Sequence, residues 1–566
     1  MNEMPPNQTP TSGFLRRPDP KAIGNLDRGA QILGGELQLA GHVLKGDPFA
    51  AGPQPPNVAA ELHGFGWLDD LAALATHPAR AMAQKRVFDW IGDHPIADDG
   101  APEWAPEVAG KRLLRWIFHS GQILPGLDRA ASAPYFDALE THVNFLAENW
   151  HLSPDGRPRL ETLVGLAVAA LYLRGAEHLV MPALIALAEE AEAMGPELLA
   201  EARSPEALLE SCALLVWTVE VAAEAEIEAP PQLMAMVGEL APLLRAMRHA
   251  DGALPQFHGG GRGAPGRLDH CLRATPGPAT TARGMALGFA RLVRGRSTVI
   301  VDAAPPPTGA AAATAHASTL AFEMTVARQP LIVSCGPGQG FGPIWARASR
   351  ATPCHSALCL AGLSSSRLGP AAGMAAGVVG SAPDLLTERP ENVWAGDYDG
   401  QGQIIGPDFG LPHSGTVAHM LAGHDGWLQS HGLTHLRELW LDPDGFTLDG
   451  EDSLAALDES AQAQLAAQIG GFDTAEPHGG IGFDIRFHLH PEVTPTVEGD
   501  LVQLTLPNGE IWSFNHDGTA ELRIEPSCWL DPAQAGPIPT RQIVLTAVMT
   551  GRAIQIGWTL ARSGGS

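Results

Sequence analysis

The periodicity of the chain changes near residue 295, and this change limits the folds that its 566 residues can adopt. Before it, apolar residues recur at helical spacing, and residues 160–173 are almost wholly apolar. After it, short apolar runs such as 320–326 and 541–550 are separated by Gly, Pro and Asp. The sequence therefore predicts a helical domain followed by an antiparallel β-sandwich, each long enough to bury its own core.

Three segments follow from this division. Residues 1–25 are expected to be a disordered N-terminal segment, residues 26–295 the helical domain and residues 296–566 the sandwich. Helices in sequential antiparallel pairs would stack as an α/α toroid or as a bundle. The pair Ser204-Pro205 predicts a helix start, because Ser caps a first turn and Pro suits the first helical position.

Composition narrows the classes of partner. The formal net charge is −27, from 63 acidic and 36 basic residues, which argues against a nucleic-acid partner. No apolar run is long enough to cross a membrane, and the start lacks an export signal, so a cytoplasmic location is favoured. The six cysteines show no CxxC pair, and we expect them to be reduced and buried.

Four short motifs lie along the two halves. Residues 62–68 read Leu-His-Gly-Phe-Gly-Trp-Leu, and residues 314–323 read Thr-Ala-His-Ala-Ser-Thr-Leu-Ala-Phe-Glu. Residues 424–427 read His-Asp-Gly-Trp, and residues 486–491 read Arg-Phe-His-Leu-His-Pro. In this order the motifs resemble the heparinase II/III-like family of polysaccharide lyases over almost the whole chain. The resemblance implies an α/α toroid plus β-sandwich fold, with the periplasm or cell envelope as an alternative location.

Members of that family cleave acidic polysaccharides by β-elimination. The reaction needs a group that neutralises the uronate carboxylate, a base that takes the neighbouring proton and an acid that protonates the leaving oxygen. The resemblance therefore implies a lyase acting on a uronate-containing polysaccharide or oligosaccharide. In the family, a Tyr and a His typically serve as base and acid.

The candidates for catalysis here are His316, His355 and His424, in segments that resemble the active-site face of the family. Ala207 stands where the family has its Tyr after a Ser-Pro pair. Another group must then act as base, and neutral imidazole, with an ordinary pKa of about 6.5, suits that role. We expect the three histidines to converge in one cleft between the domains.

Other side chains are candidates for substrate binding. A guanidinium can pair bidentately with a uronate carboxylate, and an indole can stack on a sugar ring. We expect the arginines to make the cleft basic despite the net charge. These candidates are His63, Trp67, Arg203, Arg248, His249, Arg262, Arg267, Arg347, Arg350 and His435.

A resident metal is not expected. Thr314 and Ser318 replace the first His and the Asp of the family motif, which leaves His316 and His424 from the metal-binding set. Two histidines are too few for a zinc site. Zinc or calcium remains the less favoured alternative.

Two alternatives to a lyase stay open. One is a catalytically impaired, lyase-like protein that binds a glycan without cleaving it. The other is an interaction scaffold that uses the acidic surface. An unsaturated product that absorbs in the ultraviolet would distinguish the lyase from both, and glycan binding without turnover would distinguish the two alternatives from each other.

Overall fold

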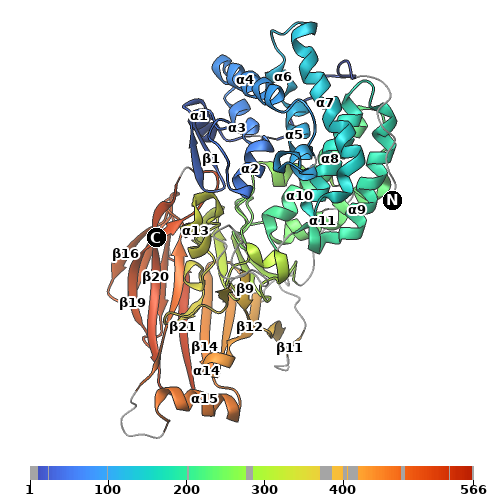
Figure 1. The fold of residues 1–566 in the computed structure, drawn as a ribbon. Helices are drawn as coiled ribbons and strands as arrows, with labels where there is room; N and C mark the ends of the chain where they lie inside the picture. The colour runs from blue at the N-terminus through green and yellow to red at the C-terminus, as the bar shows by residue number, and fades with distance from the viewer. Residues whose placement is uncertain are drawn as a thin grey trace.

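The computed structural model describes residues 11–563, apart from residues 23, 99, 201–202, 276–278, 280–284, 370–384, 399–403, 406–417, 473–478 and 535. The helical N-terminal half lies at one end of the β-sandwich that the C-terminal half forms (Figure 1). The predicted order, an α/α toroid-like domain followed by an antiparallel β-sandwich, is confirmed.

The helical domain packs successive helices side by side, with a β-hairpin inserted after the first. Pro occupies one of the first two positions of α4, α5, α8, α10 and α11, where its missing N–H costs nothing. The Ser204 hydroxyl caps α10 as predicted, accepting the N–H of Ala207 at 3.3 Å. The elements are α1 (Leu26–Leu33), β1 (Glu36–Leu39), β2 (His42–Lys45), α2 (Pro56–His63), α3 (Trp67–Ala73), α4 (His77–Asp93), α5 (Pro106–Phe118), α6 (Ser120–Ile123), α7 (Arg129–Asn149), α8 (Arg157–Tyr172), α9 (Val180–Leu199), α10 (Pro205–Glu224), α11 (Pro231–Ala246) and α12 (Arg267–Ala274).

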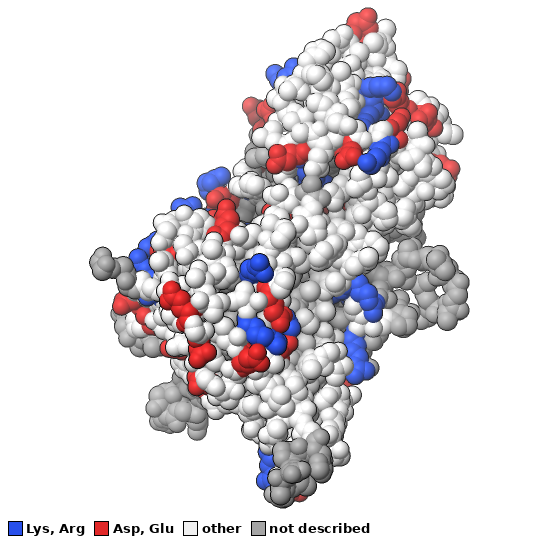
Figure 2. All heavy atoms as spheres, turned by 90° about the vertical axis from the view of Figure 1, so that its left-hand side faces the viewer, with Lys and Arg blue, Asp and Glu red and all other residues white. Residues whose placement is uncertain are grey.

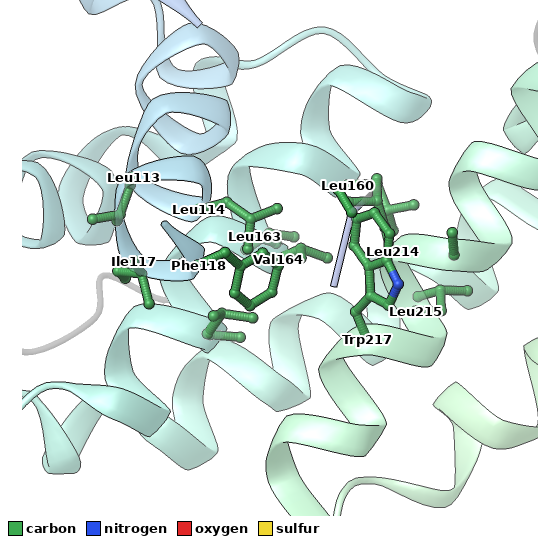
Figure 3. Close-up of a cluster of buried hydrophobic side chains, with 14 of the residues drawn as sticks. Leu113, Leu114, Ile117, Phe118, Leu160, Leu163, Val164, Leu214, Leu215 and Trp217 are labelled. Atoms are coloured by element: carbon green, nitrogen blue, oxygen red, sulfur yellow. The ribbon is translucent and has the colours of Figure 1, made fainter. Parts of the chain in front are cut away.

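The core of this domain lies where α5, α8 and α10 meet. Leu and aromatic side chains from the three helices fill the space between them, with Phe118 facing Val164 and Trp217 beside Leu160 (Figure 3). Gly110 and Gly165 let α5 and α8 approach closely, since a Cβ on Gly165 would lie 2.5 Å from the Gly110 carbonyl oxygen. This packing explains why α8 is buried on nearly every side.

The sandwich consists of two large antiparallel sheets whose apolar faces meet. Phe322, Phe487, Phe514 and Trp558 pack between them. The first sheet has the order β11 (Ile404–Ile405), β10 (Val393–Tyr398), β12 (Ala418–Trp427), β13 (Leu433–Leu441), β14 (Thr447–Ala455), β21 (Ala553–Arg562), β18 (Ile511–His516), β17 (Leu501–Thr505) and β16 (Thr494–Glu498). The second has the order β19 (Glu521–Trp529), β20 (Ile538–Met549), β15 (Ile481–Leu489), β6 (Gln329–Val333), β5 (Phe322–Val326), β4 (Ser297–Asp302) and β3 (Phe289–Arg294), with β7 (Leu358–Leu360) also on β15.

Smaller elements complete this half. The short strands β8 (Arg367–Gly369) and β9 (Leu385–Glu388) pair with each other. Helix α13 (Pro343–Ala348) follows β6, α14 (Leu428–His431) joins β12 to β13, and α15 (Glu459–Ile469) follows β14. The hairpin β1–β2 lies against the segment before α13, where Gln38 Nε2 donates to the Gly340 carbonyl at 2.8 Å. This contact ties the two domains together at one side of their junction.

Two predicted boundaries are wrong. Residues 11–25 were expected to be disordered, but the described ones pack on the helical domain, where the Leu15 N–H donates to the Tyr172 carbonyl at 2.7 Å. The boundary at 295/296 would cut the hairpin that joins β3 to β4. The sandwich therefore begins between α12 and β3. Among the described residues, no helix is both long and apolar enough to span a membrane.

Candidate functional site

A buried polar cluster joins the two domains and contains two of the three predicted catalytic histidines. We call it the junction cluster. It draws on the turn before α10, the loop after α11, the end of β4, the loop before β5 and the turn before β7. Its members are Arg203, His258, Asp302, His316 and His355. Arg203 and His258 have φ of 59° and 50°, so the backbone is held in an uncommon conformation on the helical side.

Asp302 is the anion of the junction cluster. Its carboxylate accepts from Arg203 Nη2 at 2.7 Å and from the Ser318 hydroxyl at 2.6 Å. Burial alone would raise the pKa of Asp302, but the positive charge of Arg203 and the contact with His258 outweigh it and hold the pKa below its usual value. Arg203 also donates to the carbonyls of Leu287, Gly288, Ala304 and Pro305, so its guanidinium is committed to the protein.

The tautomer of His258 follows from its partners. Its Nδ1 accepts the backbone N–H of His316 at 3.1 Å, so Nε2 carries the proton and donates to Asp302 at 3.1 Å. The Nε2 of His316 accepts the N–H of Gly259 at 3.0 Å, which places the proton of His316 on Nδ1. Each imidazole is therefore oriented by the backbone of the other segment.

His316 and His355 lie side by side, with ring centroids 4.9 Å apart. Both side chains are 0 % exposed. Burial, reinforced by neighbouring imidazoles, lowers the pKa of His355 to about 3 and holds that of His316 well below its usual value. The Nδ1 of His316 has no partner, and the ring of His355 makes no complete hydrogen bond, with only a loose polar contact to the Ser349 backbone. Both rings are neutral at physiological pH and closed to solvent.

His424 belongs to a different group within the sandwich, which we call the sheet cluster. The register of β12 and β13 places His424 opposite His435, and that of β13 and β14 places Arg437 opposite Asp452. His435 Nε2 donates to Asp452 at 2.8 Å, so its Nδ1 accepts from His424 Nε2 at 3.2 Å. His424 Nδ1 in turn accepts the Gly426 N–H at 3.1 Å. The sheet cluster is completed by Trp558, whose Nε1 donates to Asp452 at 2.9 Å.

Arg437 connects the sheet cluster to the loops of the junction cluster. It binds Asp452 through two nitrogens, at 2.8 and 2.9 Å, and donates to the carbonyls of Leu320 and Ser356. The structure thus brings His316 and His355 together but places His424 and His435 in a separate, fully bonded group. The reason is strand register, which aims His424 at His435 rather than at the domain junction.

The other predicted binding residues are mostly used by the fold. Trp67 is 2 % exposed and packs on Phe65 with ring centroids 4.9 Å apart, so it is a core residue rather than a sugar platform. His63 is half-buried and accepts from Trp90 Nε1 at 3.0 Å, and burial lowers its pKa to about 4. His249 is buried and contacts the Thr325 hydroxyl at 3.0 Å.

The predicted arginines do not form an open basic cleft. Arg248 pairs with Asp269 at 2.7 Å, while Arg262 pairs with Asp251 and Arg267 with Glu210. Arg350 is buried and donates to the carbonyls of Ala312 and Ala315, and Arg347 lies exposed on α13. On the face shown in Figure 2, basic and acidic side chains are interspersed. Carboxylates close to Arg248, Arg262 and Arg267 therefore cancel much of their field.

The residues that sequence reasoning missed are the ones that hold the imidazoles. Asp302 ends an apolar strand, and His258 lies in a Gly-rich loop, positions that indicate nothing by themselves. The sequence gives a weak indication of Asp452, since it is a lone carboxylate at an inward position of β14, where buried residues alternate with half-buried or exposed ones. Within the described residues, no three His, Cys, Asp or Glu side chains are arranged to hold a metal ion.

An open pocket of about 360 Å³ lies beside the sheet cluster. It is lined by residues of the loop before β8, the segment before β10 and the end of β12, and its charged members are Arg367, Arg389, Glu391 and Asp425. The Ser366 hydroxyl is buried and has no hydrogen-bond partner. The volume of the pocket is suited to a small ligand of one or two rings.

The comparisons with known proteins agree with this architecture. The family described as "Heparinase II/III-like, C-terminal" matches residues 276–559. The chain superposes on the crystal structure of heparinase III with a TM-score of 0.63 at 10 % identity, covering 100 % of this chain and 88 % of that one. For heparan sulfate lyase HepC from Pedobacter heparinus the TM-score is 0.52 at 11 % identity, covering 95 % of this chain and 83 % of that one. These two likenesses establish the shared fold.

A relative whose name does not describe a lyase is similar in sequence along almost the whole chain. The chain is 29 % identical over 572 residues to FtsZ-localized protein C of Caulobacter vibrioides (strain NA1000 / CB15N), a match that covers 98 % of this chain and 91 % of the relative. The family match spans half of the chain and coincides with the β-sandwich and the segment leading into it. The protein belongs to the heparinase II/III-like family.

Proposed function

We propose that this protein binds an acidic saccharide on a heparinase II/III-like scaffold without cleaving it, and that it does so where FtsZ assembles. The observation that carries the first part is the closure of the candidate catalytic pair. His316 and His355 are 0 % exposed, and a base must reach within hydrogen-bond distance of the proton that it removes.

The helical side of the site supports the same proposal. Ala207, at the position of the family's Tyr, is 7 % exposed and belongs to the capped first turn of α10. The adjacent Arg203 is bound to Asp302 and to backbone carbonyls, so it is not available to neutralise a uronate carboxylate. A β-elimination would lack its base and the group that acidifies the proton.

The pocket beside the sheet cluster is the proposed binding site. Arg367 and Arg389 carry positive charge there, Glu391 and Asp425 carry negative charge, and Ser366 adds an unpartnered hydroxyl. The two guanidinium groups suit a uronate carboxylate, and the two carboxylates suit the hydroxyls of a sugar. The cellular location is proposed from the relative named for its localization with FtsZ.

The binding test uses titration calorimetry with uronate disaccharides and tetrasaccharides. Arg389→Gln should weaken the affinity about tenfold, the loss of one charge-assisted hydrogen bond. Arg541→Gln, on β20 and outside the pocket, is the matched control and should bind like the parent protein. Equal affinities for the two variants would remove the pocket assignment.

The location test uses a fluorescent fusion expressed from the native locus together with labelled FtsZ. Coincident bands at midcell support the proposal. A uniform distribution, or one along the whole envelope, argues against a role at the FtsZ assembly. The cytoplasm remains the proposed compartment, and the same fluorescence images test it.

The second candidate is an active lyase that acts on a uronate polysaccharide. It is favoured by one observation, the contact of two neutral imidazoles whose ring nitrogens are left without full hydrogen bonding. Opening of the junction would expose a base and an acid together. Release of an ultraviolet-absorbing unsaturated product from heparan, chondroitin or alginate would establish it, with a loss of about 10²–10⁴-fold in His316→Ala or His355→Ala. If none of these polymers yields product, the binding proposal stands.

A further inference from the structure

A β-bulge in β12 forms part of the wall of the pocket beside the sheet cluster. The register of β12 with β13 shifts between His424 and Trp427, so that Asp425 and Gly426 of β12 stand opposite a single residue of β13. A bulge bends its strand and turns the side chains within it in a new direction. Asp425 and Gly426 both line the pocket, so the bulge belongs to the proposed saccharide site.

The Asp425 side chain holds the segment that forms the facing wall. Its Oδ1 accepts the backbone N–H groups of Glu391 and Asn392 at 2.9 and 3.0 Å, and its Oδ2 accepts the side-chain amide of Asn392 at 2.7 Å. The Asp425 N–H in turn donates to the Asn392 carbonyl at 3.3 Å. An ionised carboxylate offers about four acceptor positions, and the protein itself uses most of them here. Asp425 therefore ties the segment before β10 to the bulge.

Gly426 brings the other walls of the pocket against the bulge. A Cβ on Gly426 would lie 2.7 Å from the Ser365 carbonyl oxygen and 3.2 Å from Cγ of Pro390. The next residue, Trp427, donates its Nε1 to the Ser364 carbonyl at 3.2 Å. The loop before β8, the segment before β10 and the end of β12 thus meet at these two bulged residues. The geometry of the pocket is set at that point.

The position of Arg389 depends on the same contacts. Arg389 precedes Pro390, and a proline ring restricts the backbone of the residue before it. With this proline against the bulge and the next amide bound to Asp425, the backbone of Arg389 has little freedom. The Nη1 of Arg389 donates to the Pro306 carbonyl at 3.1 Å. A guanidinium has five N–H donors, so others are left for a ligand.

We propose that Asp425 is the positioning residue of the saccharide pocket, and that it holds Arg389 where the guanidinium meets a uronate carboxylate. This inference rests on the proposed function, because it assigns a role within the same pocket. The negative charge of Asp425 by itself repels an anionic ligand. A positioning role has the opposite effect, because the anionic ligand then binds more tightly with the Asp425 carboxylate in place than without it.

The sign of the effect is measured by titration calorimetry with uronate tetrasaccharides. Asp425→Asn removes the charge and turns one acceptor oxygen into an NH2 donor that faces N–H groups. The affinity should fall about tenfold, as for Arg389→Gln. Glu451→Gln, on β14 and outside the pocket, removes the same charge and should bind like the parent protein. An affinity of Asp425→Asn equal to the parent's or higher would overturn the inference.

A double variant separates positioning from direct contact with the sugar. If Asp425 acts through Arg389, the loss in Asp425→Asn combined with Arg389→Gln should stay at about tenfold. Independent contributions would multiply to about hundredfold. A hundredfold loss would overturn the positioning role, because Asp425 would then contribute without Arg389. A general weakening of the fold would not produce this dependence on one arginine.

Asn392→Ala tests the same contact from the other side, even if Asp425→Asn fails to fold. Asn392 is exposed, and its loss removes one hydrogen bond to Asp425, so the affinity should fall about threefold.

Hydrogen exchange provides a measurement that needs no ligand. The amides of residues 391 and 392 should exchange faster in Asp425→Asn than in the parent protein, since their acceptor is lost. Unchanged exchange would overturn the inference. A parent protein that binds no uronate saccharide would overturn the proposed function and this inference together. A parent that binds, with unchanged affinity in Asp425→Asn and Asn392→Ala, would overturn the positioning role alone.

Discussion

The junction cluster and the sheet cluster contain the same kinds of groups but differ in how completely these groups are bonded. Each sets one buried carboxylate against one arginine and at least two histidines. In the sheet cluster, both rings use all their nitrogens, because the three strands that carry His424, His435 and Asp452 are neighbours in one sheet. In the junction cluster, His316 and His355 keep unpartnered nitrogens.

This difference in hydrogen bonding indicates which buried polar groups of the fold are available for function. Strand register fixes a polar cluster so fully that its groups serve stability alone. A cluster formed where two domains meet depends on loops, and some of its polar atoms have no hydrogen-bond partner. The unpartnered imidazoles of the junction cluster are therefore the groups that an opening motion could release for chemistry, and those of the sheet cluster are not.

The largest effect is expected from removing the carboxylate of the sheet cluster. Asp452→Ala leaves Arg437 buried at 0 % exposure without its counter-ion, which should cost about 3–5 kcal/mol in the free energy of unfolding. Urea unfolding followed by tryptophan fluorescence measures this loss. Glu451→Gln, the preceding residue on the outward side of β14, is the control and should stay within about 0.5 kcal/mol. A loss below 1 kcal/mol for Asp452→Ala would show that water or a rearranged partner satisfies Arg437.

A substitution in the junction cluster is expected to cost less free energy of unfolding, and to change the number of thermal transitions. Asp302→Ala removes the anion that Arg203 and His258 share, yet Arg203 is 16 % exposed and keeps its backbone partners, so the cost should be about 3 kcal/mol. Because this contact joins the two domains, calorimetry should show one transition in the parent splitting into two in the variant. A single transition in Asp302→Ala would mean that the junction cluster does not couple the domains.

The sequence predicted what depends on local patterns and missed what depends on docking. Alternation and turn residues were enough for the sandwich, and Ser204 was enough for the start of α10. The boundary at 295/296 failed because β3 reads as a continuation of the helical half until its pairing with β4 is known. His316 and His355 were found, since they stand in motifs. Asp302 and His258 were not, because the contact between them spans 44 positions, and nothing local to either residue indicates the other.

Acid should destabilise the protein through the buried histidines. The pKa of His355 is about 3 when folded and about 6.5 when unfolded, so its contribution is complete above pH 6.5 and is lost as the pH falls toward 3. At pH 5 this single group accounts for roughly 2 kcal/mol. His355→Leu should reduce the loss of stability between pH 7 and pH 5 by that amount, and His151→Leu, at an exposed position, is the control. An unchanged pH dependence would show that His355 is hydrated in solution.

The smallest effect concerns the arginines that were expected to make a basic cleft. Arg248 and Asp269 are 39 % and 46 % exposed, so their pairing is a surface ion pair. Arg248→Gln should lower the free energy of unfolding by less than about 1 kcal/mol, and 0.5 M salt should remove the difference, because the Debye length is then only a few ångströms. The same variant should bind uronate tetrasaccharides as the parent does, in contrast to Arg389→Gln. Weaker binding by Arg248→Gln would instead indicate that the glycan binds at the domain junction. The buried His316 and His355 would then again be candidates for contact with the sugar.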